Sequence, residues 1–179
     1  MKISEWLKYN IERTEHDGFV ISGARGSGKT THMMAMAYEL EMNKFRVKVC
    51  YDIDDIPEGL DKYDCLCLDD FATKFYKRDS STKRNKEFAK LIQEIREVLP
   101  LIITTAPSKS LFDKDIRAMF KELFVLTPGL LIMEGGLFFE VDLLADGFPK
   151  WFKMKKEEER KLKRERAKKF IENMKNGIR

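Results

Sequence analysis

The chain has 179 residues, of which 43% are hydrophobic and 36% charged, so it is long enough for one hydrophobic core but too short for two full-sized domains. It contains no apolar run long enough to cross a bilayer and no N-terminal secretory signal, which predicts a cytoplasmic protein without membrane association. Residues 150–179 hold thirteen Lys/Arg and five Glu, net +8, and this leaves the first 149 residues at −4. We therefore expect a core over 1–149 and a basic helical tail over 150–179.

Along the chain, short apolar segments alternate with segments of helical periodicity. Strands are expected at Phe19–Ile21, Arg46–Tyr51, Cys65–Leu68, Leu101–Thr105 and Phe124–Leu126, and helices at Ile3–Arg13, Thr30–Asn43, Glu87–Leu99 and Leu111–Leu123. This alternation predicts an α/β fold, a three-layer sandwich around a five-stranded, mainly parallel sheet. The apolar segment Leu130–Val141, with Gly135-Gly136 at its centre, predicts a terminal β-hairpin that packs on the core or meets a partner subunit.

A glycine-rich loop joins the first expected strand to the helix that follows it. Its residues, Gly23-Ala24-Arg25-Gly26-Ser27-Gly28-Lys29-Thr30, match the pattern G-x-x-x-x-G-K-[ST]. The glycines permit backbone conformations that aim successive N–H groups at phosphates beside a helix N-terminus. We expect the loop and the adjoining Thr31 to bind ATP, with Lys29 on the β- and γ-phosphates and Thr30 as a ligand of Mg²⁺. Arg25 occupies a variable position of the pattern and receives no role of its own.

Two aspartates follow the apolar strand Cys65–Leu68. Asp69 is placed to hold Mg²⁺ through its water shell, and Asp70 to orient or deprotonate the attacking water. A helix cap or a strand-end turn is the alternative use of such a pair. Thr104 and Thr105 end the next strand, and either would reach the γ-phosphate or the water if that strand lies between the loop strand and the Asp69 strand. Threonine favoured simply by its strand propensity is equally compatible with the sequence.

Arg117 lies in the segment Phe112–Phe120, which has the pattern of an amphipathic helix. It is a candidate arginine finger that would neutralise charge on the nucleotide of a neighbouring subunit. An arginine on the solvated face of a helix is the alternative.

From Phe19 to Leu126 the order of these features resembles the AAA+ ATPases of the DnaC/IstB helicase-loader and transposition-helper type. The resemblance implies an oligomeric, Mg²⁺-dependent ATPase with a partner from replication or mobile-element machinery. It also implies that Lys29 and Thr30 are the nucleotide and magnesium positions, Asp69-Asp70 the second acidic motif, Thr105 the polar sensor and Arg117 the finger. The chain departs from the family in two respects. A hairpin and tail stand where complete members carry a helical lid, and Asp70 stands where most AAA+ proteins have glutamate.

Beyond the P-loop, positive charge is concentrated in two places. Trp151 and Phe152 open the basic tail, and a basic loop spans Lys74–Lys86; either one predicts contact with nucleic acid, DNA above all. The alternatives for the tail are a solvated helix with Glu–Lys pairs, such as Glu157–Lys161 and Glu159–Lys163, or an acidic protein partner. Three functions stay open: a helper ATPase acting beside DNA, a small nucleotide or metabolite kinase, and a nucleotide-dependent switch with little turnover.

Overall fold

A computed structural model describes residues 1–13, 16–71, 83–112 and 114–177 of the chain. The chain divides into two compact units, Met1–Leu143 and Leu144–Arg179. In the part of the chain that the structure describes, every helix is too short or too polar to cross a lipid bilayer.

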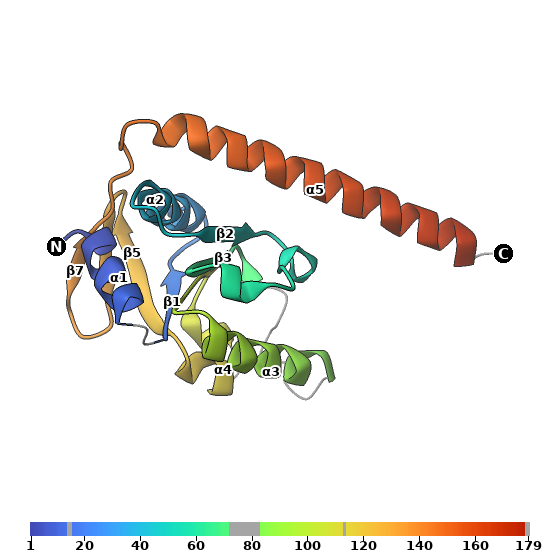
Figure 1. The fold of residues 1–179 in the computed structure, drawn as a ribbon, viewed down its shortest axis with the longest axis horizontal. Coiled ribbons are helices and arrows are strands. Elements are labelled where there is room, and N and C mark those ends of the chain that lie inside the picture. Colours follow the sequence, from blue (N-terminus) through green and yellow to red (C-terminus); the bar gives the residue numbers. More distant parts are fainter. Residues whose placement is uncertain (14–15, 72–82, 113, 178–179) are drawn as a thin grey trace. The chain divides into compact units, whose positions relative to one another are not determined.

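The first unit is built on a seven-stranded sheet with the strand order β2-β3-β4-β1-β5-β6-β7 (Figure 1). Neighbours among the first five strands run parallel, and β6 and β7 continue the sheet as antiparallel strands. The predicted α/β class and the five parallel strands are confirmed, and the predicted hairpin adds two further strands to the same sheet. The strands are β1 (Asp17–Ser22), β2 (Val47–Cys50), β3 (Cys65–Leu68), β4 (Leu101–Ala106), β5 (Lys121–Thr127), β6 (Leu130–Met133) and β7 (Phe138–Glu140).

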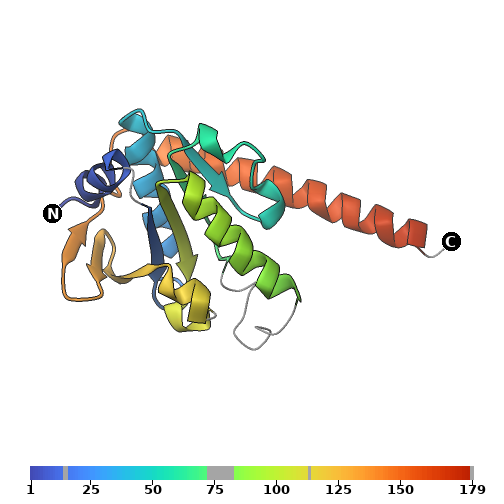
Figure 2. The ribbon, with the colours of Figure 1, turned by 60° about the horizontal axis from the view of Figure 1, so that its bottom comes forward.

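Helices cover both faces of this sheet (Figures 1 and 2). The helices α1 (Ile3–Glu12) and α2 (Lys29–Met42) lie on one face, and α3 (Lys83–Val98) and α4 (Lys114–Ala118) lie on the other. Because side chains alternate along a strand, one set of strand residues faces α3 and α4. Their shared core contains strand residues such as Val20, Leu66 and Ile102 together with Ile92 and Ile116 from the helices. Burial on both faces explains why the parallel strands are continuous apolar runs in the sequence.

The predicted helix over Leu111–Leu123 is wrong over most of its length. A 3₁₀ turn occupies Lys109–Leu111, α4 ends at Ala118, and β5 already begins at Lys121. The apolar spacing of Phe112, Ile116 and Phe120 is helical, and all three side chains are buried in one core, but from Lys121 onward the backbone pairs with β1. A Cβ at Gly18 would lie 2.5 Å from the carbonyl oxygen of Met119, so glycine permits this close approach of the chain.

The helix expected from Glu87 begins earlier, at Lys83. The basic loop predicted over Lys74–Lys86 therefore lies mostly outside the described residues, and its last residues belong to α3.

The second unit contains α5 (Phe148–Gly177), the long charged helix that the sequence predicts. Pro149 lies in its first turn, where a backbone N–H has no carbonyl partner within the helix. The lack of an N–H on proline therefore costs no hydrogen bond here. Glu159 accepts hydrogen bonds from Lys156, at 2.8 Å, and from Lys163. Two cations on one carboxylate stabilise this turn of the helix, as the Glu–Lys alternative for the tail anticipates.

Candidate functional site

The glycine-rich loop lies between β1 and α2, and three of its glycines have backbone conformations that other residues rarely adopt. The φ angles are 150° at Gly23, 83° at Gly26 and 86° at Gly28, which precedes the first residue of α2. A Cβ at Gly23 would lie 2.8 Å from the Ser27 hydroxyl oxygen. The loop is therefore a tight turn that requires glycine both for its dihedral angles and for its close internal contact.

Lys29 folds back over this loop. Its Nζ donates hydrogen bonds to the carbonyl oxygens of Gly23 and Ala24, both at 2.9 Å. The Ser27 hydroxyl is buried and has no hydrogen-bond partner among the described residues. An ammonium group, an unsatisfied hydroxyl and a helix N-terminus thus adjoin one another, and this combination suits an anionic phosphate group.

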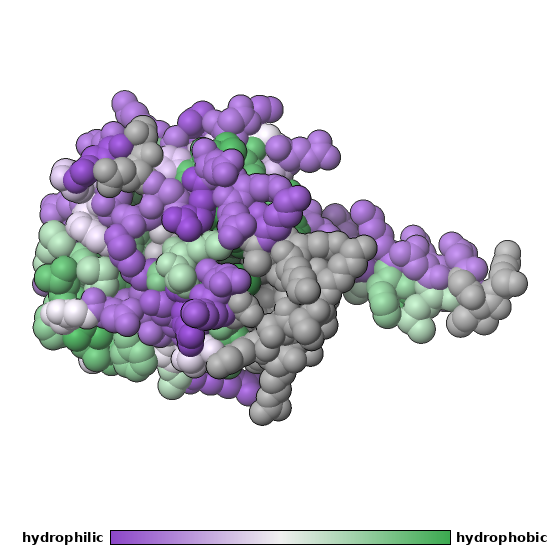
Figure 3. Space-filling model, turned by 90° about the horizontal axis from the view of Figure 1, so that it is seen from below, coloured by the Kyte–Doolittle hydropathy of each residue, from purple (hydrophilic) through white to green (hydrophobic). Residues whose placement is uncertain are grey.

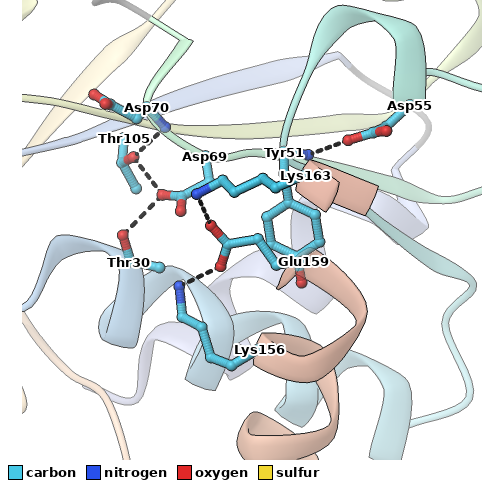
Figure 4. Close-up of polar contacts among 9 residues, drawn as sticks. All are labelled: Thr30, Tyr51, Asp55, Asp69, Asp70, Thr105, Lys156, Glu159 and Lys163. Atoms are coloured by element: carbon cyan, nitrogen blue, oxygen red, sulfur yellow. Dashed lines mark hydrogen bonds and ion pairs between the residues drawn. The ribbon is translucent and has the colours of Figure 1, made fainter. Parts of the chain in front are cut away.

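A second group of polar side chains meets the start of α2 (Figure 4). One carboxylate oxygen of Asp69 accepts hydrogen bonds from the hydroxyls of Thr30, at 2.8 Å, and Thr105, at 2.9 Å. The backbone N–H of Asp70 donates to the same Thr105 hydroxyl at 2.8 Å. These residues meet because β4 lies between β1 and β3 and all three strands end at one edge of the sheet. This strand order is the condition under which the sequence predicted a threonine at the site.

The two threonines at the end of β4 have different roles in the structure. Thr104 is buried and its hydroxyl donates to the carbonyl oxygen of Leu68 at 2.9 Å, so it joins β4 to β3. Thr105 is the one that reaches Asp69. Asp70 is exposed and has a left-handed φ of 55°, and in Figure 4 its carboxylate points away from the contact between Thr30 and Asp69.

The donor set fits a magnesium ion bound with phosphate. Hydroxyl and carboxylate oxygens are the ligands that Mg²⁺ prefers, and it usually takes only one or two from the protein while phosphates and waters complete its shell. The oxygens of Thr30 and Asp69 lie 2.8 Å apart beside the loop. The loop and this pair therefore lie together, and their donor groups suit a phosphate and its metal.

The remaining predicted residues lie around this site or away from it. Arg25 is exposed in the loop, and Thr31 is half-buried in the first turn of α2. Arg117 lies on α4 in a cleft of about 470 Å³, with Lys109, Lys114 and Glu134 also in its lining. No residue of the glycine-rich loop lines this cleft, so the structure does not bring Arg117 to the loop of the same chain.

One residue of the site was not predicted from the sequence, namely His32. Its side chain is 1% exposed, its Nδ1 lies 2.8 Å from the carbonyl oxygen of Gly28, and its Nε2 accepts from the N–H of Gly129 at 3.0 Å. These partners require the proton on Nδ1 and leave Nε2 as the acceptor. His32 therefore joins the N-terminus of α2 to the turn between β5 and β6. Its position two residues after the P-loop pattern is the only sequence signal, and it does not reveal the distant partner.

In a comparison with known protein families, one family model matches this chain. Residues 9–115 match the model of the family described as "Novel STAND NTPase 3", and no curated protein matches the chain.

Solved structures with a similar fold include AMPPCP-bound DnaA from Aquifex aeolicus, which is 19% identical with a TM-score of 0.48 over 66% of this chain and 44% of that one. Domain III of the Thermotoga maritima replication initiation protein DnaA is 16% identical, with a TM-score of 0.48 over 65% and 56%. The N-terminal domain of zonular occludens toxin from Neisseria meningitidis is 16% identical, with a TM-score of 0.44 over 71% and 85%. The chain thus matches less than two thirds of the length of either DnaA structure.

The family match confirms the predicted P-loop NTPase, while the narrower resemblance to the DnaC/IstB type stays a prediction. The family match covers more than half of the chain and includes the glycine-rich loop, Asp69, Asp70 and Thr105. The protein therefore belongs to the Novel STAND NTPase 3 family.

Proposed function

We propose that this protein binds ATP with Mg²⁺ at the loop Gly23–Thr30 and hydrolyses it. The observation that carries the proposal is the sharing of one Asp69 oxygen by Thr30 and Thr105 beside the first turn of α2. That arrangement connects a phosphate-binding loop to the strand edge from which a water molecule is oriented in phosphoryl transfer.

Each polar residue of the site has a separate role in this proposal. Lys29 exchanges its two carbonyl partners for the β- and γ-phosphates, and Thr30 is a direct ligand of Mg²⁺. Asp69 holds waters of the metal shell, and Asp70 accepts the proton of the attacking water. Thr105 positions Asp69 and senses the γ-phosphate. Bound Mg²⁺ would supply charge neutralisation on the phosphates.

Arg117 acts, in this proposal, on the nucleotide of a neighbouring copy. Its cleft contains the further cations Lys109 and Lys114, and a cluster of cations suits the charge on a transferring phosphoryl group. The lining of this cleft contains no residue of the glycine-rich loop of the same chain, which supports a role between subunits.

We further propose that the ATPase works beside DNA as a loader or helper for replication or mobile-element proteins. The support is the net charge of +8 over residues 150–179, which favours binding to a phosphate backbone. A small kinase and a nucleotide-dependent switch remain the competing functions. The adjacent carboxylates of Asp69 and Asp70 favour activation of water over transfer to a bound acceptor.

One set of measurements separates these functions. Phosphate release is followed with Mg²⁺ and ATP or GTP, alone, with single- or double-stranded DNA, and with a panel of nucleoside acceptors. DNA-stimulated release that is lost in Lys29→Ala but kept in the exposed control Lys62→Ala supports the helper ATPase. ADP formation that depends on an acceptor indicates a kinase, and tight binding without turnover indicates a switch. A protein that binds neither nucleotide would refute all three.

A further inference from the structure

One face of β5, β6 and β7 carries an exposed row of apolar side chains. Phe124, Ile132 and Phe138 are cross-strand neighbours in the sheet register, and Phe124 and Phe138 are 45% and 54% exposed. On the opposite face of these strands the side chains are buried, and Phe139 packs against Trp6 of α1 with ring centroids 5.1 Å apart. Figure 3 shows apolar surface at the left end of the molecule, the side on which Figure 1 places β7.

Acidic residues border this row. The alternation that exposes Phe124, Ile132 and Phe138 also puts Glu122, Glu134 and Glu140 on the same face. Glu122 and Glu134 lie on one side of the row, and Glu140 lies on the other. Glu134 is paired with Lys109 at 2.9 Å. The outer sheet face, as we name these six residues, is thus an apolar centre with an acidic rim. An apolar cluster that stays exposed on a folded unit marks an interaction surface.

The end of α5 carries a surface of the complementary kind. Phe170, Ile171 and Met174 are more than half exposed, and their spacing puts them on one side of the helix. Basic residues flank this apolar stripe on both sides, namely Arg166 on one and Arg164, Lys168 and Lys175 on the other. The same helix shows an apolar group among polar atoms near its C-terminal end in Figure 3.

We propose that the outer sheet face of one molecule binds the apolar stripe of α5 from a second copy of this chain. The apolar row would receive Phe170 and Met174, while the flanking arginines and lysines approach the glutamates of the rim. Apolar anchors surrounded by opposite charges give both burial and orientation to an interface. A helix laid on an apolar surface is a common mode of recognition.

The length of the connection favours a second copy over the same chain. Val141 is tied to the sheet by a hydrogen bond from its N–H to the carbonyl oxygen of Gly129, at 2.9 Å. The six residues 142–147 then span at most about 20 Å when fully extended. Phe170 lies 22 residues after the start of α5 at Phe148, or about 33 Å along a rigid helix. The turn between Ala145 and Phe148 shortens the connection further, so the stripe reaches another molecule more easily than its own sheet.

Because the two surfaces differ, the contact is head-to-tail, and an open assembly keeps one free sheet surface at one end and one free stripe at the other. This property gives a sharp test. Phe138→Glu removes the sheet surface and leaves the stripe, whereas Phe170→Glu removes the stripe and leaves the sheet surface. Each variant alone should lose self-association, and an equimolar mixture should regain it as a dimer that grows no further.

The experiment is sedimentation velocity of the full chain over a concentration series, with circular dichroism to verify that each variant is folded. Met42→Glu makes the same charge change at a 65% exposed site on α2 and should associate like the parent protein. We expect at least tenfold weaker association for Phe138→Glu and for Phe170→Glu, and weaker association of the parent at high salt. Lys29→Ala should associate like the parent protein, because the contact does not depend on nucleotide hydrolysis.

Three results would overturn the proposal. A parent protein that stays monomeric over the whole series would exclude self-association through these surfaces. Dimers that persist in Phe170→Glu but not in Phe138→Glu would mean that two sheet faces pair with each other. Failure of the mixture to form dimers from two folded variants would exclude the head-to-tail contact.

Discussion

The chemistry of the site depends on how one carboxylate oxygen is shared. Asp69 accepts from Thr30 and Thr105 through the same oxygen, and the backbone N–H of Asp70 donates to the Thr105 hydroxyl. The position of Asp69 is therefore fixed by two hydroxyl donors from different elements. The side chain of Asp70 is exposed and points away from the contact between Thr30 and Asp69, so the two neighbouring aspartates should respond differently to substitution.

Asp70→Asn should keep ATP binding and lose hydrolysis. Asparagine tolerates the left-handed φ of 55° found at this position, so the turn is kept while the base is lost. Loss of a general base lowers turnover by about 10² to 10⁴. Single-turnover phosphate release measures the rate, and titration with a fluorescent ATP analogue measures binding. Turnover equal to that of the parent protein would remove the role assigned to Asp70.

His32→Ala should destabilise the first unit, because the N–H of Gly129 loses its acceptor and the imidazole leaves a cavity. An unsatisfied group of this kind costs about 1–3 kcal/mol of the free energy of unfolding. His32→Gln offers an amide oxygen near the position of Nε2 and should recover part of the loss. Urea unfolding with the two variants measures the difference. Equal stability of His32→Ala and the parent would show that the link to Gly129 carries no energy.

At the scale of whole elements, the sequence predicted which segments are strands better than it predicted which strands are neighbours in the sheet. Continuous apolar runs such as Cys65–Leu68 and Leu101–Ala106 are recognisable because both faces of a central parallel strand are buried. The insertion of β4 between β1 and β3 is a long-range pairing that no local pattern encodes. For this reason the sequence left Thr104 and Thr105 as alternatives, and only the register separates them.

The wrong prediction of a helix over Leu111–Leu123 has a related cause. The helical spacing of Phe112, Ile116 and Phe120 is real, and it buries these residues under the sheet. The strand that follows is determined by pairing of Lys121 with Phe19, more than a hundred residues away in sequence. The P-loop was predictable because its glycines and Lys29 are local requirements, whereas the partner of His32 depends on the distant β5–β6 turn.

The starts of β2 and β3 are joined by an ion pair whose strength depends on pH. Asp64 accepts from the backbone N–H of Arg46 and from its guanidinium group, with N–O distances of 2.7 to 3.1 Å. The hydrogen bonds from the Arg46 side chain are the main cause that lowers the pKa of Asp64 below its ordinary value. A lowered pKa in the folded state means that the stabilisation is complete above the unfolded pKa of about 4 and is lost as the pH falls through the folded pKa.

Asp64→Asn should therefore melt at a slightly lower temperature than the parent at pH 7, and the difference should vanish in strong acid. The effect is small because the Arg46 side chain is largely exposed and solvent screens the pair. Thermal melts from pH 7 down to pH 2 measure it, with Asp54→Asn as a control at an exposed site. A difference in melting temperature that stays constant over this range would contradict the assignment to Asp64 ionisation.

Considered as a whole molecule, the chain separates its charges between the two parts predicted from the sequence. The first 149 residues have a net charge of −4 and the remaining 30 a net charge of +8. A polyanion such as DNA is therefore attracted by one part and repelled by the other, and binding to such a polyanion would orient the protein on it.

Ending the chain after Pro149 tests whether this charge separation serves DNA binding. The shortened protein loses thirteen basic residues, so its affinity for DNA should fall and its dependence on salt should flatten. Each phosphate contact contributes about 0.9 to the slope of log K against log salt. Fluorescence anisotropy with a labelled duplex, measured at several salt concentrations, gives this slope. Basal ATP turnover should survive, because the P-loop, Asp69 and Thr105 all lie within Met1–Leu143.

A full-length variant with Lys161, Lys168 and Lys169 changed to Gln separates charge from chain length, because it keeps a helix of the same size. We expect it to show a slope between those of the parent and the shortened protein. If all three proteins bind DNA with the same affinity and the same slope, the contact with DNA does not involve the tail. The charge separation would then favour an acidic protein partner, because the same cations would still attract carboxylates without a phosphate backbone.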